Sequence, residues 1–212
     1  MTLDLILAFA AYAFVTSITP GPNNTMLLYS GANFGFRASV PHMLGVALGF
    51  GIMVLGVGLG IGAIFQIFPV LHDILRWAGA AYLLYLAWKI ASSGPPDGGA
   101  GAGRPMTFLQ AAAFQWVNVK AWIMAIGAVA TYTPADGYFA NLILVTIVFT
   151  LVDLPCVAAW VGAGSALRGF LADPMRLRVF NVAMALLLVA SLYRSSSKQS
   201  TPGEMPGCRQ TF

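Results

Sequence analysis

Apolar residues dominate long stretches of this chain, and short polar stretches separate them. Six such stretches cover residues 3–29, 40–68, 69–89, 107–132, 138–166 and 179–192. A helix crosses the hydrocarbon core of a bilayer, ~30 Å thick, with ~20 apolar residues, so the pattern predicts six transmembrane helices. The sixth stretch is short for a bilayer, and Arg178 and Arg194 at its ends would have to extend toward the headgroups.

The segment Pro20-Gly21-Pro22 interrupts the first apolar stretch. Each proline lacks an N–H group and displaces the carbonyl four residues earlier, so the carbonyls of Thr16 and Ile18 lose their helical partners. Inside a membrane, irregular backbone persists only where protein buries it or where it lines a watery cavity, and transporters hold substrates at such broken helices. The sequence therefore predicts a broken first helix with a binding site beside the break.

A purely structural kink is the alternative interpretation of this break. Neighbouring helices would then satisfy the freed backbone groups, and Asn23 and Asn24 would form hydrogen bonds between helices. Two prolines around a glycine, followed by two asparagines, favour the binding site over the kink.

The composition is that of an integral membrane protein. Of the 212 residues, 58% are hydrophobic and 8% are charged, and the mean hydropathy is +0.79, whereas an ordinary soluble domain has roughly 25% charged residues. Glycine, proline and serine are frequent in residues 93–105, which predicts a linker between two three-helix halves, 1–92 and 106–194. Residues 195–212 are polar and predict a disordered tail. The predicted fold is an all-α integral membrane protein with one six-helix domain, residues 1–194.

The net charge of +4 is spread thinly over the loops, so we expect contact with lipid headgroups and no nucleic-acid binding. Cytoplasmic loops of membrane proteins carry an excess of Lys and Arg. The first, third and fifth predicted loops carry Arg37, Lys89, Arg104, Arg168, Arg176 and Arg178. The opposite side carries Arg76, Arg194, Lys198 and Arg209. This difference predicts that both termini lie outside the cytoplasm.

Two charged residues lie near the centres of predicted helices, Lys120 in the fourth and Asp153 in the fifth. A charge at that depth costs about 2.5–3.5 kcal/mol on insertion scales, so both side chains must point toward the protein interior. Gln115 and Asn118 add amide groups to the fourth helix. Pro155 follows Asp153 by two residues, and we expect it to disturb the fifth helix, with Asp153 capping the half that follows.

Together these residues favour a site for a zwitterion such as an α-amino acid. Lys120 and the N–H groups of half-helices would face a carboxylate, while Asp153 and freed carbonyls would face an ammonium group or a proton. The candidate substrate-binding residues are Thr19, Asn23, Asn24, Gln115, Asn118, Lys120 and Asp153, and the candidate helix-breaking residues are Pro20, Gly21, Pro22 and Pro155. Asp153 is also the candidate proton-coupled group. The alternative is a buried Lys120–Asp153 salt bridge that only fixes helix packing.

Other functional classes lack the residues that they need. Cys156 and Cys208 form no pair and no metal-ligand spacing, and His42 and His72 stand alone near helix starts, where we expect them at the membrane interface. No nucleophile–base pattern is present, so we expect neither an enzyme nor a cofactor. Efflux of another small solute or of a metal ion, and a role as a non-transporting membrane subunit, stay open as alternatives.

Two further patterns concern packing. Small residues in the second predicted helix would let another helix backbone approach closely, within the chain or between copies, so a homo-oligomer is possible. They are Gly45, Gly49, Gly56 and Gly60. Three aromatic residues of the fourth helix are candidates for the wall of a pocket for an apolar side chain: Phe114, Trp116 and Trp122.

The first break reads Thr19-Pro20-Gly21-Pro22-Asn23, and further motifs follow at Gly35-Phe36-Arg37, Gly79-Ala80-Ala81-Tyr82-Leu83, Trp88-Lys89 and Asp153-x-Pro155. Together they resemble the lysine exporter/homoserine-threonine resistance (LysE/RhtB) family of bacterial amino-acid efflux proteins, over residues 1–194. That family has an Asn-Pro-Lys motif in its fourth helix, where this chain has Asn118-Val119-Lys120. Because the proline is missing, we expect the fourth helix to remain unbroken.

This resemblance implies properties that the residues alone do not give. They are six spans built from two three-helix halves as an inverted repeat, residence in a bacterial inner membrane, and export of amino acids or related metabolites driven by the proton gradient. We expect this export to proceed by alternating access, and the termini that the charge count places outside the cytoplasm then lie in the periplasm.

Overall fold

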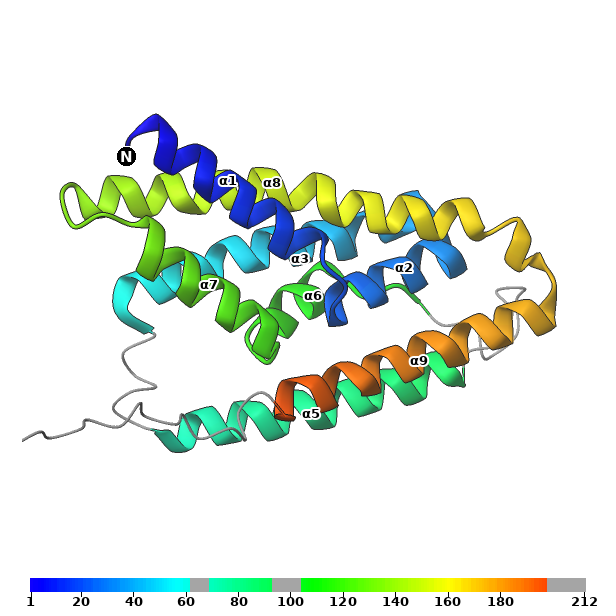
Figure 1. Cartoon of the computed structure of the whole chain (residues 1–212). Helices are drawn as coiled ribbons and strands as arrows, with labels where there is room; N and C mark the ends of the chain where they lie inside the picture. The colour runs from blue at the N-terminus through cyan, green and yellow to red at the C-terminus, as the bar shows by residue number, and fades with distance from the viewer. Residues whose placement is uncertain (62–68, 93–103, 198–212) are drawn as a thin grey trace, which may run out of the picture.

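The chain folds into helices joined by short connections. The computed structural model describes residues 1–61, 69–92 and 104–197, and these ranges contain no strand (Figure 1). The predicted all-α class is confirmed. Residues 93–103 of the predicted linker (93–105) lie outside the described residues, and so do residues 198–212 of the predicted tail.

Each half of the chain has a bent pair of helices followed by two further helices. The N-terminal half contains α1 (Leu3–Ile18), α2 (Pro22–Phe34), α3 (Phe36–Gly56) with the π-helical turn η1 (Val57–Ile61), and α5 (Pro69–Ala91). The C-terminal half contains α6 (Phe108–Gln115), α7 (Val119–Tyr132), α8 (Tyr138–Leu167), the 3-10 turn η2 (Phe170–Ala172) and α9 (Pro174–Ser197). This repeated order agrees with the predicted two-half arrangement.

Within the described ranges, three helical stretches are long and apolar enough to cross a membrane: Phe36–Ile61, Tyr138–Leu167 and Pro174–Ser191. Counting each bent pair, α1 with α2 and α6 with α7, as one span brings the number to five. Helix α5 is not among them, so six spans stays a prediction.

The first helix is broken where the prolines predict it. Helix α1 ends at Ile18, α2 begins at Pro22, and the two axes differ in direction by 59°. Pro22 occupies the first position of α2, where its missing N–H group costs nothing and its fixed φ angle suits a helix start. The predicted break at Pro20-Gly21-Pro22 is confirmed.

The fourth apolar stretch is also broken, and our expectation that it would remain one helix is wrong. Helices α6 and α7 meet at 65°. Asn118 caps α7, since its side-chain oxygen accepts a hydrogen bond from the Lys120 backbone N–H at 3.2 Å. The indole N–H of Trp122 donates to the Trp116 carbonyl at 2.8 Å, which satisfies a group that the break frees. The Asn118 cap therefore starts a new helix here, as Pro22 does in the first break.

The predicted disturbance of the fifth stretch at Pro155 is wrong. Helix α8 runs unbroken from Tyr138 to Leu167, so Pro155 breaks no helix and Asp153 caps none. Pro155 is exposed, and a proline ring in that position removes a single helical hydrogen bond. Packing against α1, α2 and α3 holds α8 together on its other side.

Several boundaries also differ from the sequence prediction. The expected first loop shrinks to Gly35, which has a φ of +85° and joins α2 directly to α3. Helix α9 begins earlier than the apolar stretch because Asp173 accepts hydrogen bonds from the N–H groups of Met175 and Arg176, at 2.9 and 3.0 Å. It also continues to Ser197, so the first residues of the predicted tail are helical.

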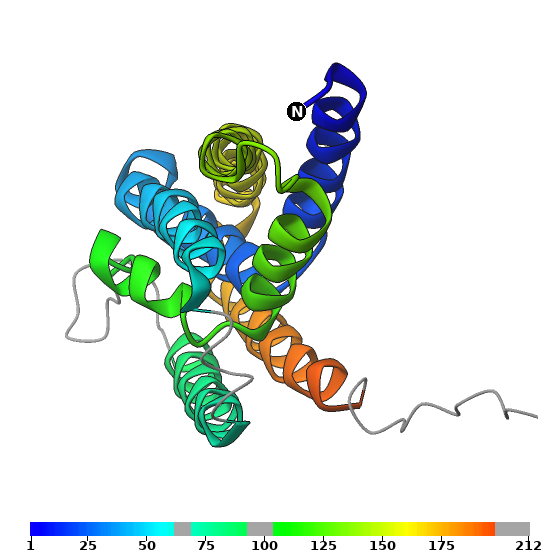
Figure 2. The same cartoon turned by 90° about the vertical axis from the view of Figure 1, so that its left-hand side faces the viewer.

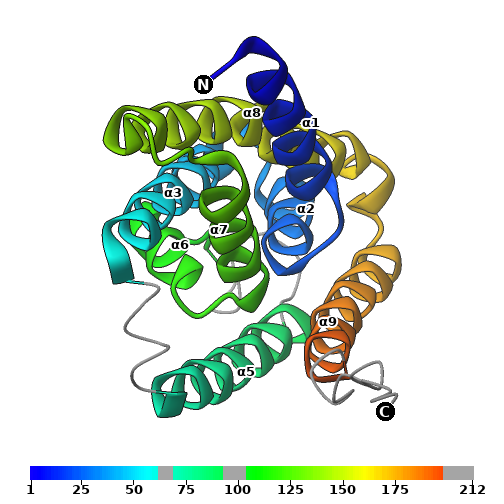
Figure 3. The same ribbon diagram turned by 60° about the vertical axis from the view of Figure 1, so that its left-hand side comes forward.

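Glycines allow the closest helix contacts. Gly45 and Gly49 of α3 lie directly against the backbone of α6, as their spacing predicts. Gly60 makes no such contact with the described residues: its φ is +104°, so it serves the turn that ends η1. Helices α5 and α9 pack on each other along one side of the molecule (Figures 1 and 2). The two breaks face each other near the centre of the bundle (Figure 3).

Candidate functional site

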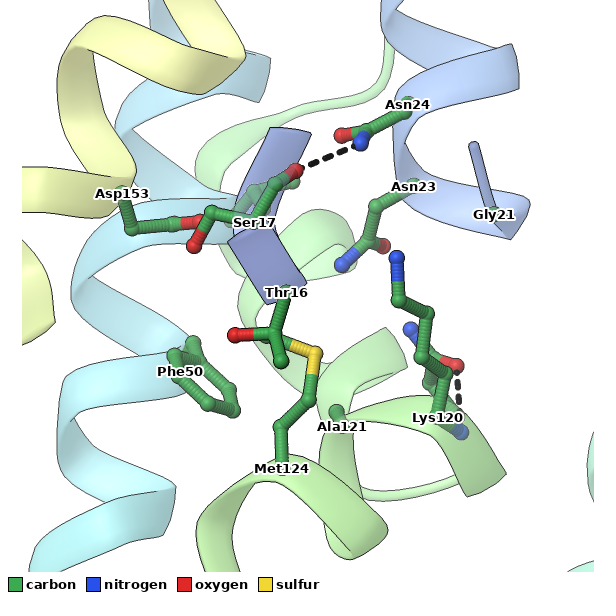
Figure 4. A pocket seen from close by; sticks show the side chains of 12 residues that line it. Thr16, Ser17, Gly21, Asn23, Asn24, Phe50, Lys120, Ala121, Met124 and Asp153 are labelled. Carbon is green, nitrogen blue, oxygen red and sulfur yellow. Dashed lines mark hydrogen bonds between the residues drawn. The ribbon is translucent and has the colours of Figure 1, made fainter. Parts of the chain in front are cut away.

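Empty space of about 360 Å³, part of it open to the outside of the molecule, forms a pocket where the two helix breaks meet α3 and α8 (Figure 4). Of the predicted residues, it is lined by Gly21, Asn23, Asn24, Asn118, Lys120 and Asp153. The structure thus brings together residues that are as much as 132 positions apart in the chain, from Gly21 to Asp153.

Side chains satisfy the backbone carbonyls at the end of α1. The Ile18 carbonyl accepts from the indole N–H of Trp160 at 3.2 Å, and the Thr16 carbonyl accepts from the Thr19 hydroxyl at 3.2 Å. Asn24 donates to the carbonyls of Ser17 and Thr19, at 2.7 and 2.8 Å. These bonds replace the helical partners that the prolines remove, so the break is a stable feature of the fold.

Lys120 reaches across from the second break to the first. Its Nζ donates to the Thr19 carbonyl at 2.7 Å, so an ammonium group sits at the C-terminal end of α1, where the helix dipole favours a positive charge. Its aliphatic part passes over Gly21, where a Cβ atom would lie 2.8 Å from the Lys120 Cδ atom. Glycine is therefore the residue that leaves room for this lysine.

Asp153 lies near the middle of α8 and is only 5% exposed. Its carboxylate and the Ser17 hydroxyl point toward each other in the pocket (Figure 4). Among the described residues, neither Asp153 Oδ2 nor Ser17 Oγ has a hydrogen-bond partner. Lys120 donates elsewhere, and no ion pair joins it to Asp153 in the part of the chain that the structure describes. The alternative of a Lys120–Asp153 salt bridge that fixes the packing is therefore not formed.

Hydrogen bonds between Asn23 and Gln115 connect the two breaks. The Asn23 amide donates to Gln115 Oε1 at 2.8 Å, and the Gln115 amide donates back to Asn23 Oδ1 at 3.3 Å and to the Ala111 carbonyl at 2.8 Å. Gln115 is fully buried behind the pocket and does not line it. Thr19 does not line the pocket either, since its hydroxyl bonds to its own helix at Val15 and Thr16 and only its carbonyl reaches Lys120.

Six further residues line the pocket that the sequence did not lead us to predict there: Thr16, Ser17, Val46, Phe50, Ala121 and Met124. Met124 follows Lys120 by four positions, a spacing that places both on one face of a helix, so the sequence contained a signal for it. Phe50 comes from α3, and nothing in its local sequence points to the pocket. None of the three aromatic residues predicted for this wall lines the pocket. Phe114 packs with α5 and α9 residues, whereas Trp116 and Trp122 belong to the same hydrophobic cluster as Phe50 and Met124.

The described residues contain no group of three or more His, Cys, Asp and Glu side chains that could hold a metal ion. His42 is 1% exposed, and its expected position at the membrane interface stays a prediction. Helix α3 begins at Phe36, so His42 is already in its second turn and packs inside the bundle. The side chain of His72 is outside the described residues.

The helix ends give the pocket a mixed polarity. The N-terminal turns of α2 and α7 contribute Asn23, Asn24 and Lys120, and partial positive charge gathers at such ends. The end of α1 contributes partial negative charge, and Asp153 adds a carboxylate. Two broken helices that meet at a polar pocket inside an apolar bundle define a membrane transport protein.

Known sequences place the chain within this class. The sequence model of the LysE type translocator family matches residues 14–191. The chain is 35% identical to the cysteine/O-acetylserine efflux proteins of Escherichia coli (strain K12) and Shigella sonnei (strain Ss046) over 193 residues, which cover 89% of this chain and 96% of each relative. No solved structure matches the chain. The chain belongs to the LysE type translocator family, and it is a multi-pass inner-membrane transport protein rather than an enzyme.

Proposed function

We propose that this protein is a secondary transporter that exports an amino acid or a close derivative across the bacterial inner membrane. The observation that carries the proposal is a cation and a carboxylate, Lys120 and Asp153, that line one pocket without pairing with each other. Such an arrangement suits a zwitterionic ligand, whose two charges would meet separate partners. The relatives' names, which specify cysteine and O-acetylserine, agree with this ligand class.

The substrate carboxylate would bind Lys120 and the N–H groups at the starts of α2 and α7. Its ammonium group would bind Asp153 and the Ser17 hydroxyl. Among the described residues, Asp153 Oδ2 and Ser17 Oγ have no hydrogen-bond partner. Phe50 and Met124, 3% and 8% exposed, would contact the side chain.

Proton coupling would act through Asp153. A buried carboxylate that forms no ion pair among the described residues is costly while charged, so binding a proton or an ammonium group lowers its energy. Competition between the two for one carboxylate would link efflux to the proton gradient. Rocking of one half against the other around this site would give alternating access, with both termini on the periplasmic side.

Flux measurements test the proposal. Purified protein in liposomes would be loaded with a panel of labelled amino acids, including cysteine and O-acetylserine, with and without an imposed pH gradient. We expect gradient-dependent efflux of a few members of the panel. If no amino acid moves, the site serves another solute or the protein does not transport.

Replacing Lys120 by alanine is expected to weaken substrate binding about tenfold or more, because a hydrogen bond to a charged group contributes about 1.5–3 kcal/mol. The measurement is the Kd of a transported amino acid and of the corresponding amine that lacks the carboxylate. The variant should lose affinity for the amino acid and bind the amine as the native protein does. Equal affinity of both proteins for the amino acid would remove Lys120 from the site.

A further inference from the structure

We infer that a second pocket, distinct from the central one, is an entry subsite that binds the carboxylate of the same substrate before it reaches the helix breaks. This inference rests on the proposed function. The second pocket has a volume of about 430 Å³ and lies among α2, α3, α5 and the segment that precedes α6. It is lined by His42, Lys89 and Arg104 together with Ser30 and apolar side chains.

The second pocket continues along α2 and α3, two of the helices that line the first. Val46 lines the central pocket and His42 lines the second, and four residues of a helix rise about 6 Å. On α2, Asn23 lines the central pocket and Met26 the second. The second pocket therefore lies one turn further toward Gly35, on the side where the basic loop residues predict the cytoplasm. An exported substrate would arrive from that side.

His42 is the observation that indicates a ligand. Its side chain is 1% exposed, and neither ring nitrogen has a hydrogen-bond partner among the described residues. Buried polar atoms in native proteins are almost always bonded, so an unbonded imidazole in the wall of a pocket is expected to find its partner in a bound molecule. Because one ring nitrogen of a neutral imidazole always carries a proton, His42 can donate to a carboxylate oxygen.

The charges around His42 select an anion. Lys89 and Arg104 bring two positive charges to the pocket, and none of its described lining residues is acidic. Ser30 adds an acceptor: Ser39 donates its hydroxyl to the Gly35 carbonyl at 2.9 Å, so Ser30 must be the donor in the 2.7 Å bond between the two hydroxyls, which keeps lone pairs of its oxygen available. An amino acid matches these groups, because its carboxylate can bind the two cations and its ammonium group can donate to Ser30.

Apolar side chains complete the pocket. Met26, Phe34, Leu86 and Met106 line it beside the polar groups. A small molecule with a carboxylate and an apolar part fits this lining better than a hydrated inorganic ion, because the apolar walls offer the latter nothing to replace its water. We therefore assign the pocket to the amino acid substrate rather than to phosphate.

Binding stoichiometry tests the inference. Calorimetric titration of cysteine and O-acetylserine would use the full-length protein in phosphatidylcholine nanodiscs. We expect each native chain to bind two substrate molecules and each Lys120→Ala chain to bind one. In Arg104→Gln and His42→Gln the second event should weaken about tenfold, as expected for a lost charge-assisted or buried hydrogen bond. Arg37→Gln is the matched control, since Arg37 is an exposed basic residue on the same side that does not line the pocket.

Each other outcome overturns the inference in a recognisable way. One molecule per chain, lost in Lys120→Ala and unchanged in Arg104→Gln, would leave the proposed function standing without an entry subsite. Two molecules in phosphatidylcholine but one in phosphatidylglycerol discs would assign the pocket to a lipid headgroup. Absence of any binding of the two amino acids would also overturn the inference, while the flux panel decides the proposed function separately. Arg104→Gln keeps the test informative if His42→Gln fails to fold, because Arg104 is exposed.

Discussion

Replacing Asp153 by asparagine is expected to reduce gradient-driven efflux to the level of liposomes without protein. Asparagine has nearly the same shape and its side-chain oxygen can accept a hydrogen bond from Ser17, but it does not take up or release a proton at physiological pH. The site is only 5% exposed, and a neutral side chain there avoids the cost of a buried charge, so the variant should fold. The measurement is efflux at several imposed pH gradients, together with the Kd of the substrate.

Asp136→Asn is the matched control for this variant. Asp136 is an exposed acidic residue in the loop before α8 and lies outside the pocket, so its replacement should leave efflux unchanged. Coupling through Asp153 requires that the Asp153→Asn protein still binds substrate while losing its response to the gradient. Efflux by that protein with the usual pH dependence would show that another group carries the proton.

Replacing Gly164 by alanine is expected to lower the free energy of unfolding by about 1–3 kcal/mol. A Cβ atom on Gly164 of α8 would overlap the Leu28 carbonyl of α2, and one on Gly31 of α2 would overlap the Val161 carbonyl of α8. Backbone atoms cannot move aside as a flexible side chain can, so the two helices would have to separate. Because α2 carries Asn23 and Asn24, the separation should also weaken substrate binding.

Gly162→Ala provides a matched control two positions away on the same helix. No described residue lies within 4 Å of a Cβ atom at Gly162, and alanine has a higher helix propensity than glycine by about 1 kcal/mol. We therefore expect this variant to be as stable as the native protein or more so. Thermal unfolding of the purified proteins in one detergent compares them, and equal midpoints for the two variants would contradict the proposed contact between α2 and α8.

The first break shows how far local sequence could predict this fold. A proline loses its hydrogen bond in any surroundings, so Pro20 and Pro22 predict the break without knowledge of the neighbours. The second break depends on a bond from Trp122 to Trp116 and on a cap at Asn118, and each of these residue types also occurs inside unbroken helices. Pro155 shows that a proline alone does not predict a break, since packing around α8 keeps it within a continuous helix.

The candidate site was predictable in part for a related reason. Polar and charged residues are costly in an apolar stretch, so Asn23, Asn24, Asn118, Lys120 and Asp153 stand out individually, and all five line one pocket. Their individual contacts were not predictable. Whether Lys120 pairs with Asp153 or with the Thr19 carbonyl depends on the relative placement of α1, α7 and α8, which only long-range packing fixes.

The sequence by itself determined the membrane class, the all-α fold, the first break and most of the polar residues of the pocket. Each of these follows from the cost of placing polar groups or prolines in an apolar helix, which is a property of the residue and its immediate neighbours. The tertiary structure alone decided the second break, the bond of Lys120 to the Thr19 carbonyl instead of to Asp153, and the burial of His42. Each of these depends on which side chain or backbone from another helix comes within hydrogen-bonding distance.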